Sequence, residues 1–176
     1  MITGFGRTGN WFGSQTFGIK PHIMTIAKGL SSGYQPIGGS IVCDEVAKTV
    51  GDAGDFNHGY TYSGHPVAAA VALENLRIMQ DERIVEHVRD VAHPYLKERW
   101  DALADHPMVG EAKLVGLMGS MALTPDKGRR GPSSRSRKGL WAYRTRERCF
   151  ANNLIMRACG GPDDHRAAAG DHAGRN

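Results

Sequence analysis

Lys28 is the residue of this sequence with the clearest potential for chemistry. It directly follows the short apolar run HIMTIA at 22–27 and precedes the glycine-rich segment GLSSGYQPIGG. A lysine at the end of a predicted strand can present an amine that attacks a carbonyl carbon or moves a proton. Arginine could not do the same, because its guanidinium stays protonated. A lone lysine in such a place can equally be a solvated surface residue.

A second polar segment, HGYTYSGH at 58–65, stands directly before a helix that Pro66 is suited to begin. The hydroxyl of Thr61 lies close to that helix start. Unpaired backbone N–H groups and the helix dipole favour an anion there, so a phosphate is one candidate ligand. The same polar residues can also serve only as a turn and a helix cap.

The sequence does not predict a metal site or disulfide bonds. Cys43, Cys149 and Cys159 are odd in number, widely spaced and without a CxxC pair, which indicates reduced thiols. His165 and His172 lie in a tail without branched aliphatic or aromatic residues, where a third ligand and a scaffold are missing.

The composition is that of a globular protein, with 40% hydrophobic and 23% charged residues in 176. No apolar run approaches the roughly 20 residues of a membrane span, so we expect no membrane association. Residues 1–20 lack the pattern of a secretory signal, and we therefore predict a cytoplasmic protein.

The net charge of +4 is concentrated in residues 127–148, where nine basic side chains face the single acid Glu147. Such a cluster can bind nucleic acid through phosphate contacts. No recognised nucleic-acid-binding motif accompanies it and aromatic residues are sparse, so the sequence favours a solvated loop and no nucleic-acid partner.

Periodicity predicts alternating strands and helices, and so an α/β fold. We expect a loop over residues 1–20, a buried strand that ends at Lys28 and a second strand at 40–43. The predicted helices cover 44–50, 66–79 and 81–104, the last bent at Pro94. A strand pair follows at 108–124, and residues 145–157 predict a helix, a stop at Asn153 and a strand. A domain boundary is expected near residue 82, giving segments 1–81, 82–160 and a tail at 161–176 without a core.

Three motifs together resemble the class III aminotransferases, a branch of the fold-type-I pyridoxal phosphate enzymes. They are ITGFGRTG at 2–9, TIAKGLSSGYQPIGG at 25–39 and HGYTYSGHPVAAAVALENL at 58–76, and the resemblance covers residues 1–126 and 144–160. It implies an α/β fold-type-I structure, with part of the large domain and the C-terminal α+β small domain. It also implies transfer of an amino group from an amine or amino acid to a keto acid such as pyruvate.

The resemblance assigns roles to single residues. Lys28 would bind pyridoxal 5′-phosphate covalently and act as the catalytic base, and Thr61 would reach the cofactor phosphate across a homodimer interface. Arg157, in the segment LIMR, resembles a mobile arginine that holds a substrate carboxylate, although it can also be an ordinary surface residue. Trp11 and Tyr34 would line the substrate pocket, or serve as packing aromatics.

The sequence also departs from the family pattern. Family members carry Asp-Glu-Val before the first motif, and the aspartate pairs with the pyridine nitrogen, whereas Met1 stands here in place of the valine. We therefore expect the later part of a family member, and a catalytically inactive fragment is the alternative interpretation. Residues 128–138 and 161–176 are hypothesised to be translations of shifted reading frames, because a one-nucleotide shift after Gly160 permits the family-like ending DRMIIAPPLVITPAE.

Overall fold

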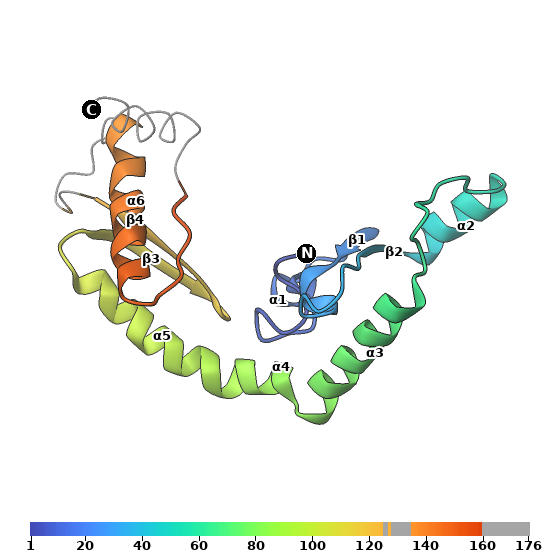
Figure 1. Cartoon of the computed structure of the whole chain (residues 1–176), viewed down its shortest axis with the longest axis horizontal. Helices are drawn as coiled ribbons and strands as arrows, with labels where there is room; N and C mark the ends of the chain where they lie inside the picture. The colour runs from blue at the N-terminus through green and yellow to red at the C-terminus, as the bar shows by residue number, and fades with distance from the viewer. Residues whose placement is uncertain (125–126, 128–134, 160–176) are drawn as a thin grey trace. The chain divides into compact units, whose positions relative to one another are not determined.

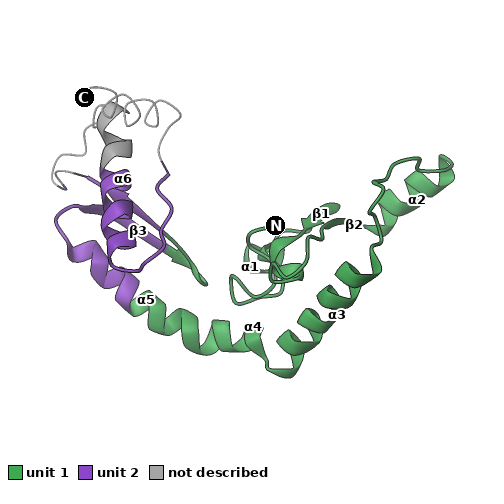
Figure 2. Ribbon diagram, in the orientation of Figure 1, with its two compact units in different colours: residues 1–98, 114–119 green, residues 99–113, 120–176 purple. Residues whose placement is uncertain are grey.

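The computed structural model describes residues 1–124, 127 and 135–159 (Figure 1). The chain divides into two compact units, one of residues 1–98 and 114–119 and the other of residues 99–113 and 120–176 (Figure 2). This division does not test the expected domain boundary near residue 82, which stays a prediction.

The strand before Lys28 is β1 (Ile23–Ile26), which pairs antiparallel with β2 (Gly39–Val42). The register sets Ile23 opposite Val42 and Ile26 opposite Gly39. The predicted positions of both strands are confirmed, but the expectation of a buried strand is wrong, because Ile23 is 58% exposed. No third strand joins this pair within the described residues, and a two-stranded ribbon covers its own side chains poorly.

The helices predicted at 44–50 and 66–79 are confirmed as α2 (Asp44–Asp52) and α3 (Pro66–Asp81). Pro66 lies in the first turn of α3, where its missing N–H costs nothing. The buried positions of α3 are Ala68, Ala72 and Met79, which recur at helical spacing on one face, whereas Leu73 is 68% exposed. Asn75, at the same helical spacing between Ala72 and Met79, hydrogen-bonds to the turn that contains Lys28.

The third predicted helix is present but irregular. It consists of α4 (Ile84–His87), a π-helical turn (Val88–Ala92), α5 (His93–Ala102) and a 3-10 turn (Leu103–Asp105). The irregularity expected at Pro94 therefore takes the form of a π turn just before it. Proline has no N–H and its ring crowds the carbonyl four residues earlier, and a wider turn relieves that crowding.

The predicted N-terminal loop is confirmed, apart from the short helix α1 (Gly13–Thr16). The backbone N–H of Phe5 donates to the carbonyl of Trp11 at 2.6 Å, which closes the turn formed by residues 5–11, here called the N-terminal turn. Gly9 has a φ of +83°, and a Cβ there would lie 3.1 Å from the Cα of Arg89. The turn thus lies close against the π turn, at a position where any side chain would be crowded and its backbone strained.

The expected strand pair at 108–124 is confirmed as β3 (Val109–Val115) and β4 (Met118–Leu123). Their connection turns at Gly116, whose φ is +57°. Residues 114–119, around this turn, belong to the first unit because most of their contacts are with it.

The last helix, α6 (Arg135–Ala151), begins well before residue 145, where the sequence predicted its start. Its predicted stop is confirmed: Asn153 has a φ of +59°, and the N–H of Leu154 donates back to the carbonyl of Cys149 at 2.8 Å. The prediction of a strand after Asn153 is wrong, since residues 154–159 form no strand and no described strand pairs with them. The segments 128–134 and 160–176 lie outside the described residues, while 135–138 belong to α6.

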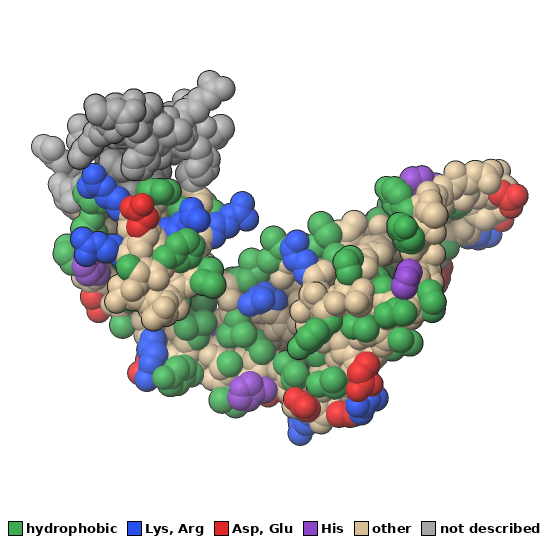
Figure 3. Space-filling view, in the orientation of Figure 1, with side chains coloured by type: hydrophobic (Ala, Val, Ile, Leu, Met, Phe, Trp, Pro, Cys, Tyr) green, Lys and Arg blue, Asp and Glu red, His purple; other side chains and the backbone are tan. Residues whose placement is uncertain are grey.

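Large hydrophobic side chains are exposed at several places, and Figure 3 shows such side chains over much of the visible surface. The exposed aromatics Phe56, Tyr60 and Tyr62 all lie in the segment before α3. Within the described residues, no helix combines the length and the apolar character needed to cross a bilayer.

Candidate functional site

Lys28 lies directly after β1, in a backbone conformation that its neighbours must maintain. Ala27 is fully extended, whereas Lys28 has a φ of +55° and begins a 3-10 turn (Lys28–Leu30). The left-handed region costs a non-glycine residue roughly 1–2 kcal/mol, and such residues cluster at functional sites. The side chain is exposed and forms no hydrogen bond or ion pair with the described residues, so its amine is available to a ligand.

The segment after Lys28, residues 28–35, is here called the lysine loop. Ser31 is 2% exposed, and its hydroxyl donates to the carbonyl of Gln35 at 2.6 Å. From α3, the side-chain amide of Asn75 donates to the carbonyls of Gly29 and Leu30 at 2.9 and 3.1 Å. The loop is therefore held both by itself and by a helix that begins much later in the chain.

Gly29 allows the lysine loop to meet the N-terminal turn. A Cβ at Gly29 would lie 2.8 Å from the Cβ of Phe5, which is closer than real Cβ atoms approach. Phe5 is itself left-handed, with a φ of +55°, and its ring stacks edge-to-face on Phe12 at 5.7 Å between centroids. The Gly29 backbone therefore lies so close to Phe5, beside Lys28, that a Cβ would not fit between them without a shift.

A cleft of about 370 Å³ opens beside Lys28 within the first unit. Among the described residues, its charged lining consists of Lys28 and Arg7 and includes no carboxylate; the apolar lining comes from Ile84, Val88 and others. The volume falls in the usual range of small-molecule pockets, about 300–1,000 Å³. Two cations and apolar walls fit a ligand with an anionic group and an apolar body, and a phosphorylated aromatic aldehyde has those properties.

The backbone of Arg7 is fixed by the turn between β3 and β4. The N–H of Leu117 donates to the carbonyl of Arg7 at 2.8 Å, and Nδ1 of His93 lies 3.0 Å from the carbonyl oxygen of Gly116. A Cβ at Gly116 would collide with the backbone of Arg7 and Thr8. Sequence reasoning missed Arg7, because an arginine in a glycine-rich turn gives no periodic signal.

Thr61 lies away from this cleft, in residues 53–65, here called the threonine segment. Residues 53–65 are all exposed, and the hydrogen bonds of 54–64 connect only near neighbours, such as Ser63 N–H to the Tyr60 carbonyl at 2.9 Å. The rings of Phe56, His58 and Tyr60 stack edge-to-face in a row, at 5.8 and 5.5 Å between centroids.

The other three predicted site residues are also outside the cleft lining. Trp11 is half-buried and contributes its backbone carbonyl to the N-terminal turn. Tyr34 is 79% exposed and lines a separate shallow depression along α3 with Ala70 and Ile78. Arg157 is exposed beyond α6, in the second unit. Of the predicted site residues, the structure places Lys28 alone on this cleft.

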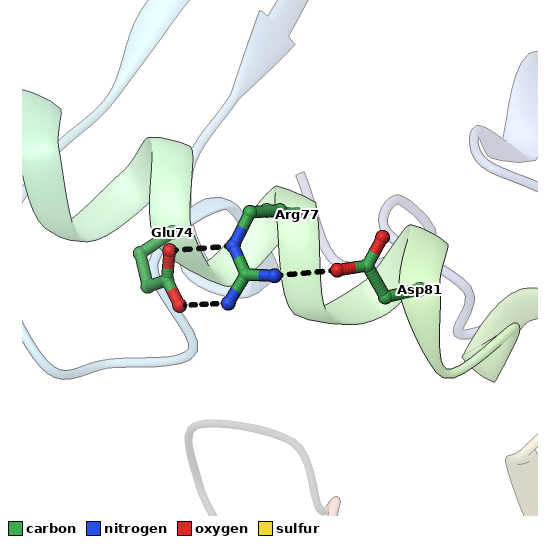
Figure 4. A network of polar contacts seen from close by, with 3 residues as sticks. All are labelled: Glu74, Arg77 and Asp81. Atoms are coloured by element: carbon green, nitrogen blue, oxygen red, sulfur yellow. Dashed lines mark hydrogen bonds and ion pairs between the residues drawn. The ribbon is translucent and has the colours of Figure 1, made fainter.

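The charged side chains of α3 pair along its exposed face (Figure 4). Arg77 donates to both carboxylate oxygens of Glu74, at 2.5 and 2.8 Å, and to Asp81 at 2.5 Å. The hydrogen bond from Arg77 lowers the pKa of Glu74, and the same bond raises the pKa of Arg77. Exposed pairs of this kind contribute little to stability, and none of the three residues lines the cleft beside Lys28.

The described cysteines are free thiols, half-buried at Cys43 and Cys149 and exposed at Cys159. Within residues 1–124, 127 and 135–159, no three His, Cys, Asp or Glu side chains are grouped to hold a metal ion. His165 and His172 lie outside these residues.

Comparison with known proteins connects this geometry to one family. The sequence profile described as aminotransferase class-III matches residues 1–158. A putrescine–pyruvate aminotransferase of Pseudomonas aeruginosa is 53% identical over 160 residues, covering 91% of this chain and 34% of that protein. Gamma aminobutyrate transaminase 3, chloroplastic, of Solanum lycopersicum is 39% identical over 164 residues, with 91% and 31% covered.

Solved structures agree with these matches. A structure described as a transaminase with L-ala superposes with a TM-score of 0.81 at 41% identity, covering 90% of this chain and 38% of the other. A thermostable (S)-enantioselective omega-transaminase from Thermomicrobium roseum gives a TM-score of 0.73 at 43% identity, with 90% and 35% covered. The chain spans about a third of the length of the curated relatives it matches.

Proposed function

The chain belongs to the class-III aminotransferases, and from that premise we propose that it acts in moving an amino group from an amine or amino acid to a keto acid. The predicted α/β fold of fold-type-I enzymes is confirmed by the solved transaminases it matches. The class is dependent on pyridoxal 5′-phosphate, as the sequence predicted. The observation that carries the proposal is the exposed amine of Lys28 on a cleft lined by cations and apolar groups.

Lys28 is the proposed attachment point for the cofactor and the proposed base. Pyridoxal phosphate supplies an aldehyde and a ring that withdraws electrons. The Lys28 amine would hold the aldehyde group of the cofactor covalently, and the same amine, when free, would carry a proton. The cleft suits this cofactor because Arg7 supplies a cation for a phosphate besides the Lys28 amine, while Ile84 and Val88 supply apolar lining.

Thr61 is proposed to bind the cofactor phosphate of a second copy of the chain, which makes the active form at least a homodimer. Its exposure, and that of the whole threonine segment, supports a position against another molecule. A hydroxyl and backbone N–H groups near the start of α3 are suitable partners for a phosphate.

Arg157 is proposed to hold the carboxylate of the keto acid, and Trp11 and Tyr34 to contact the substrate. An exposed arginine beyond the end of α6 is free to approach and leave a ligand, and its planar guanidinium can bind both oxygens of a carboxylate. Pyruvate is the proposed acceptor, because it appears in the name of the relative with 53% identity. A cytoplasmic location also stays a proposal.

The test is covalent trapping. The chain is incubated with pyridoxal phosphate, reduced with borohydride, digested and mapped by mass spectrometry. Lys28 should carry the label ahead of Lys20 and Lys48, which are also exposed. The Lys28→Ala variant should lose that label and, in an enzyme of full family length that carries this sequence, all transaminase activity. Preferential labelling of Lys20 or Lys48 would refute the assignment.

A further inference from the structure

Asn75, in the second half of α3, reaches the backbone that directly follows Lys28. Its Nδ2 donates to the carbonyl of Gly29 at 2.9 Å and to the carbonyl of Leu30 at 3.1 Å. Its Oδ1 accepts a hydrogen bond from the hydroxyl of Ser32 at 2.8 Å. One side chain thus contacts three residues of the lysine loop.

These contacts fix the orientation of the amide. Carbonyl oxygens only accept hydrogen bonds, so the Gly29 and Leu30 carbonyls identify the atom that faces them as the NH₂ group. The Ser32 hydroxyl, which can donate or accept, then donates to Oδ1. Asn75 is half-buried, Leu30 is 8% exposed, and Sδ of Met79 lies 3.7 Å from Nδ2. Water has limited access to replace the amide there, so its loss leaves two carbonyls without these bonds.

The two carbonyls follow a strained residue. Lys28 has a left-handed backbone, which a lysine adopts only where its surroundings determine it. On one side β1 holds the chain up to Ile26, and on the other the Asn75 amide holds it from Gly29 onward. The direction in which Lys28 leaves the backbone is therefore set from both sides.

We propose that Asn75 is a positioning residue that presents the Lys28 amine to the cleft, an inference that rests on the proposed cofactor role of Lys28. Asn75 has no contact with a ligand in this role. It acts through the Gly29 and Leu30 carbonyls, and Ser32 acts through Asn75. An asparagine at this point of α3 is required because it offers donors to two carbonyls and an acceptor to a hydroxyl at once.

The experiment compares lysines within one molecule. The full chain and its Asn75→Ala variant are trapped with pyridoxal phosphate and borohydride, and the label on Lys28 is divided by the label on Lys48. The ratio should fall about tenfold in the variant, since two hydrogen bonds to the loop are lost. Ser32→Ala, which keeps both donors in place, should lower the ratio less. Amide hydrogen exchange at Ser31 and Ser32 should become faster in Asn75→Ala.

The outcomes separate the two proposals. Equal labelling of Lys20, Lys28 and Lys48 in the unmodified chain overturns the cofactor role of Lys28, while hydrogen exchange still decides whether Asn75 holds the loop. An unchanged ratio in a variant that circular dichroism shows to be folded overturns the positioning role. If Asn75→Ala does not fold, Asn75→Asp is used, because it keeps the shape but removes the donors. If the ratio of label on Lys28 to label on Lys48 is unchanged in that variant, the proposal is equally refuted.

Discussion

The lysine loop and the threonine segment belong to the same unit and are both proposed to hold a cofactor, Lys28 in its own chain and Thr61 in a second copy, yet the two segments are held in place differently. The lysine loop is hydrogen-bonded to α3 and lies in contact with Phe5. The threonine segment is exposed along its length and bonded almost entirely to its own near neighbours. A residue that forms a covalent bond must be in place before its ligand arrives, and here its own chain places it. A residue that completes a neighbouring site can depend on that neighbour for order.

The largest expected effect is on stability, and it is tested by substituting one glycine in each of the two segments. Gly29→Ala should lower the free energy of unfolding by about 1–3 kcal/mol, because the new Cβ meets Phe5. Covalent trapping at Lys28 should fall with it. Gly59→Ala in the threonine segment meets nothing within 4 Å and should change the same free energy by less than about 1 kcal/mol. Chemical denaturation measures both, and equal losses would remove the distinction between the two regions.

Thr61→Ala tests the other side of the comparison, in an enzyme of full family length that carries this sequence. The binding free energy of pyridoxal phosphate should weaken by the contribution of one charge-assisted hydrogen bond, about 1.5–3 kcal/mol, which appears as a higher dissociation constant. The rate of the chemical step should change less, and the dimer should persist in analytical ultracentrifugation. Thr61→Ser is the matched control, because it keeps the hydroxyl. A dissociation constant that does not move would leave Thr61 with a turn role only.

Arg157 lies outside both regions and provides a reference for substrate binding. In the same enzyme, Arg157→Ala should raise the Michaelis constant for pyruvate by roughly tenfold or more, the value of a charge-assisted pair. The Michaelis constant for a simple amine should stay the same, because such an amine has no carboxylate for Arg157 to bind. Steady-state kinetics with both substrates measure the difference, and an equal loss for both would indicate a structural arginine.

The smallest effect is expected on the exposed face of α3. Because Arg77 lowers the pKa of Glu74, the ionised pair contributes stability above the unfolded pKa of the glutamate, and this is lost as the pH falls through its lowered folded pKa. Glu74→Gln should therefore lower the melting temperature slightly at neutral pH and not at all in acid. Added salt should reduce the difference. A change as large as that of Gly29→Ala would show that α3 supports the loop through its charges.

Local patterns predicted much of this fold, and contacts between distant segments account for most of the rest. The strand before Lys28, the helix from Pro66 and the stop at Asn153 each follow from a short run of residues. The buried face of α3 could not be predicted, because small alanines are buried there while the larger Leu73 is exposed. Asn75 gave no signal for a similar reason: its partners at Gly29 and Leu30 become neighbours only after folding.

The π turn at Val88–Ala92 has a consequence for insertions and deletions in this helix. A π turn contains one residue more than the α-helical turn that would replace it. Deleting Asp90 would therefore restore regular α-helical spacing and leave α5 near its present angle to α4, because the wider turn is what absorbs the surplus residue. His93 would stay beside the carbonyl of Gly116, from which its Nδ1 now lies 3.0 Å. A one-residue deletion within the regular turns of α5 would instead rotate the rest of that helix by about 100°, so the π turn is the place where this helix can be shortened at the lowest cost.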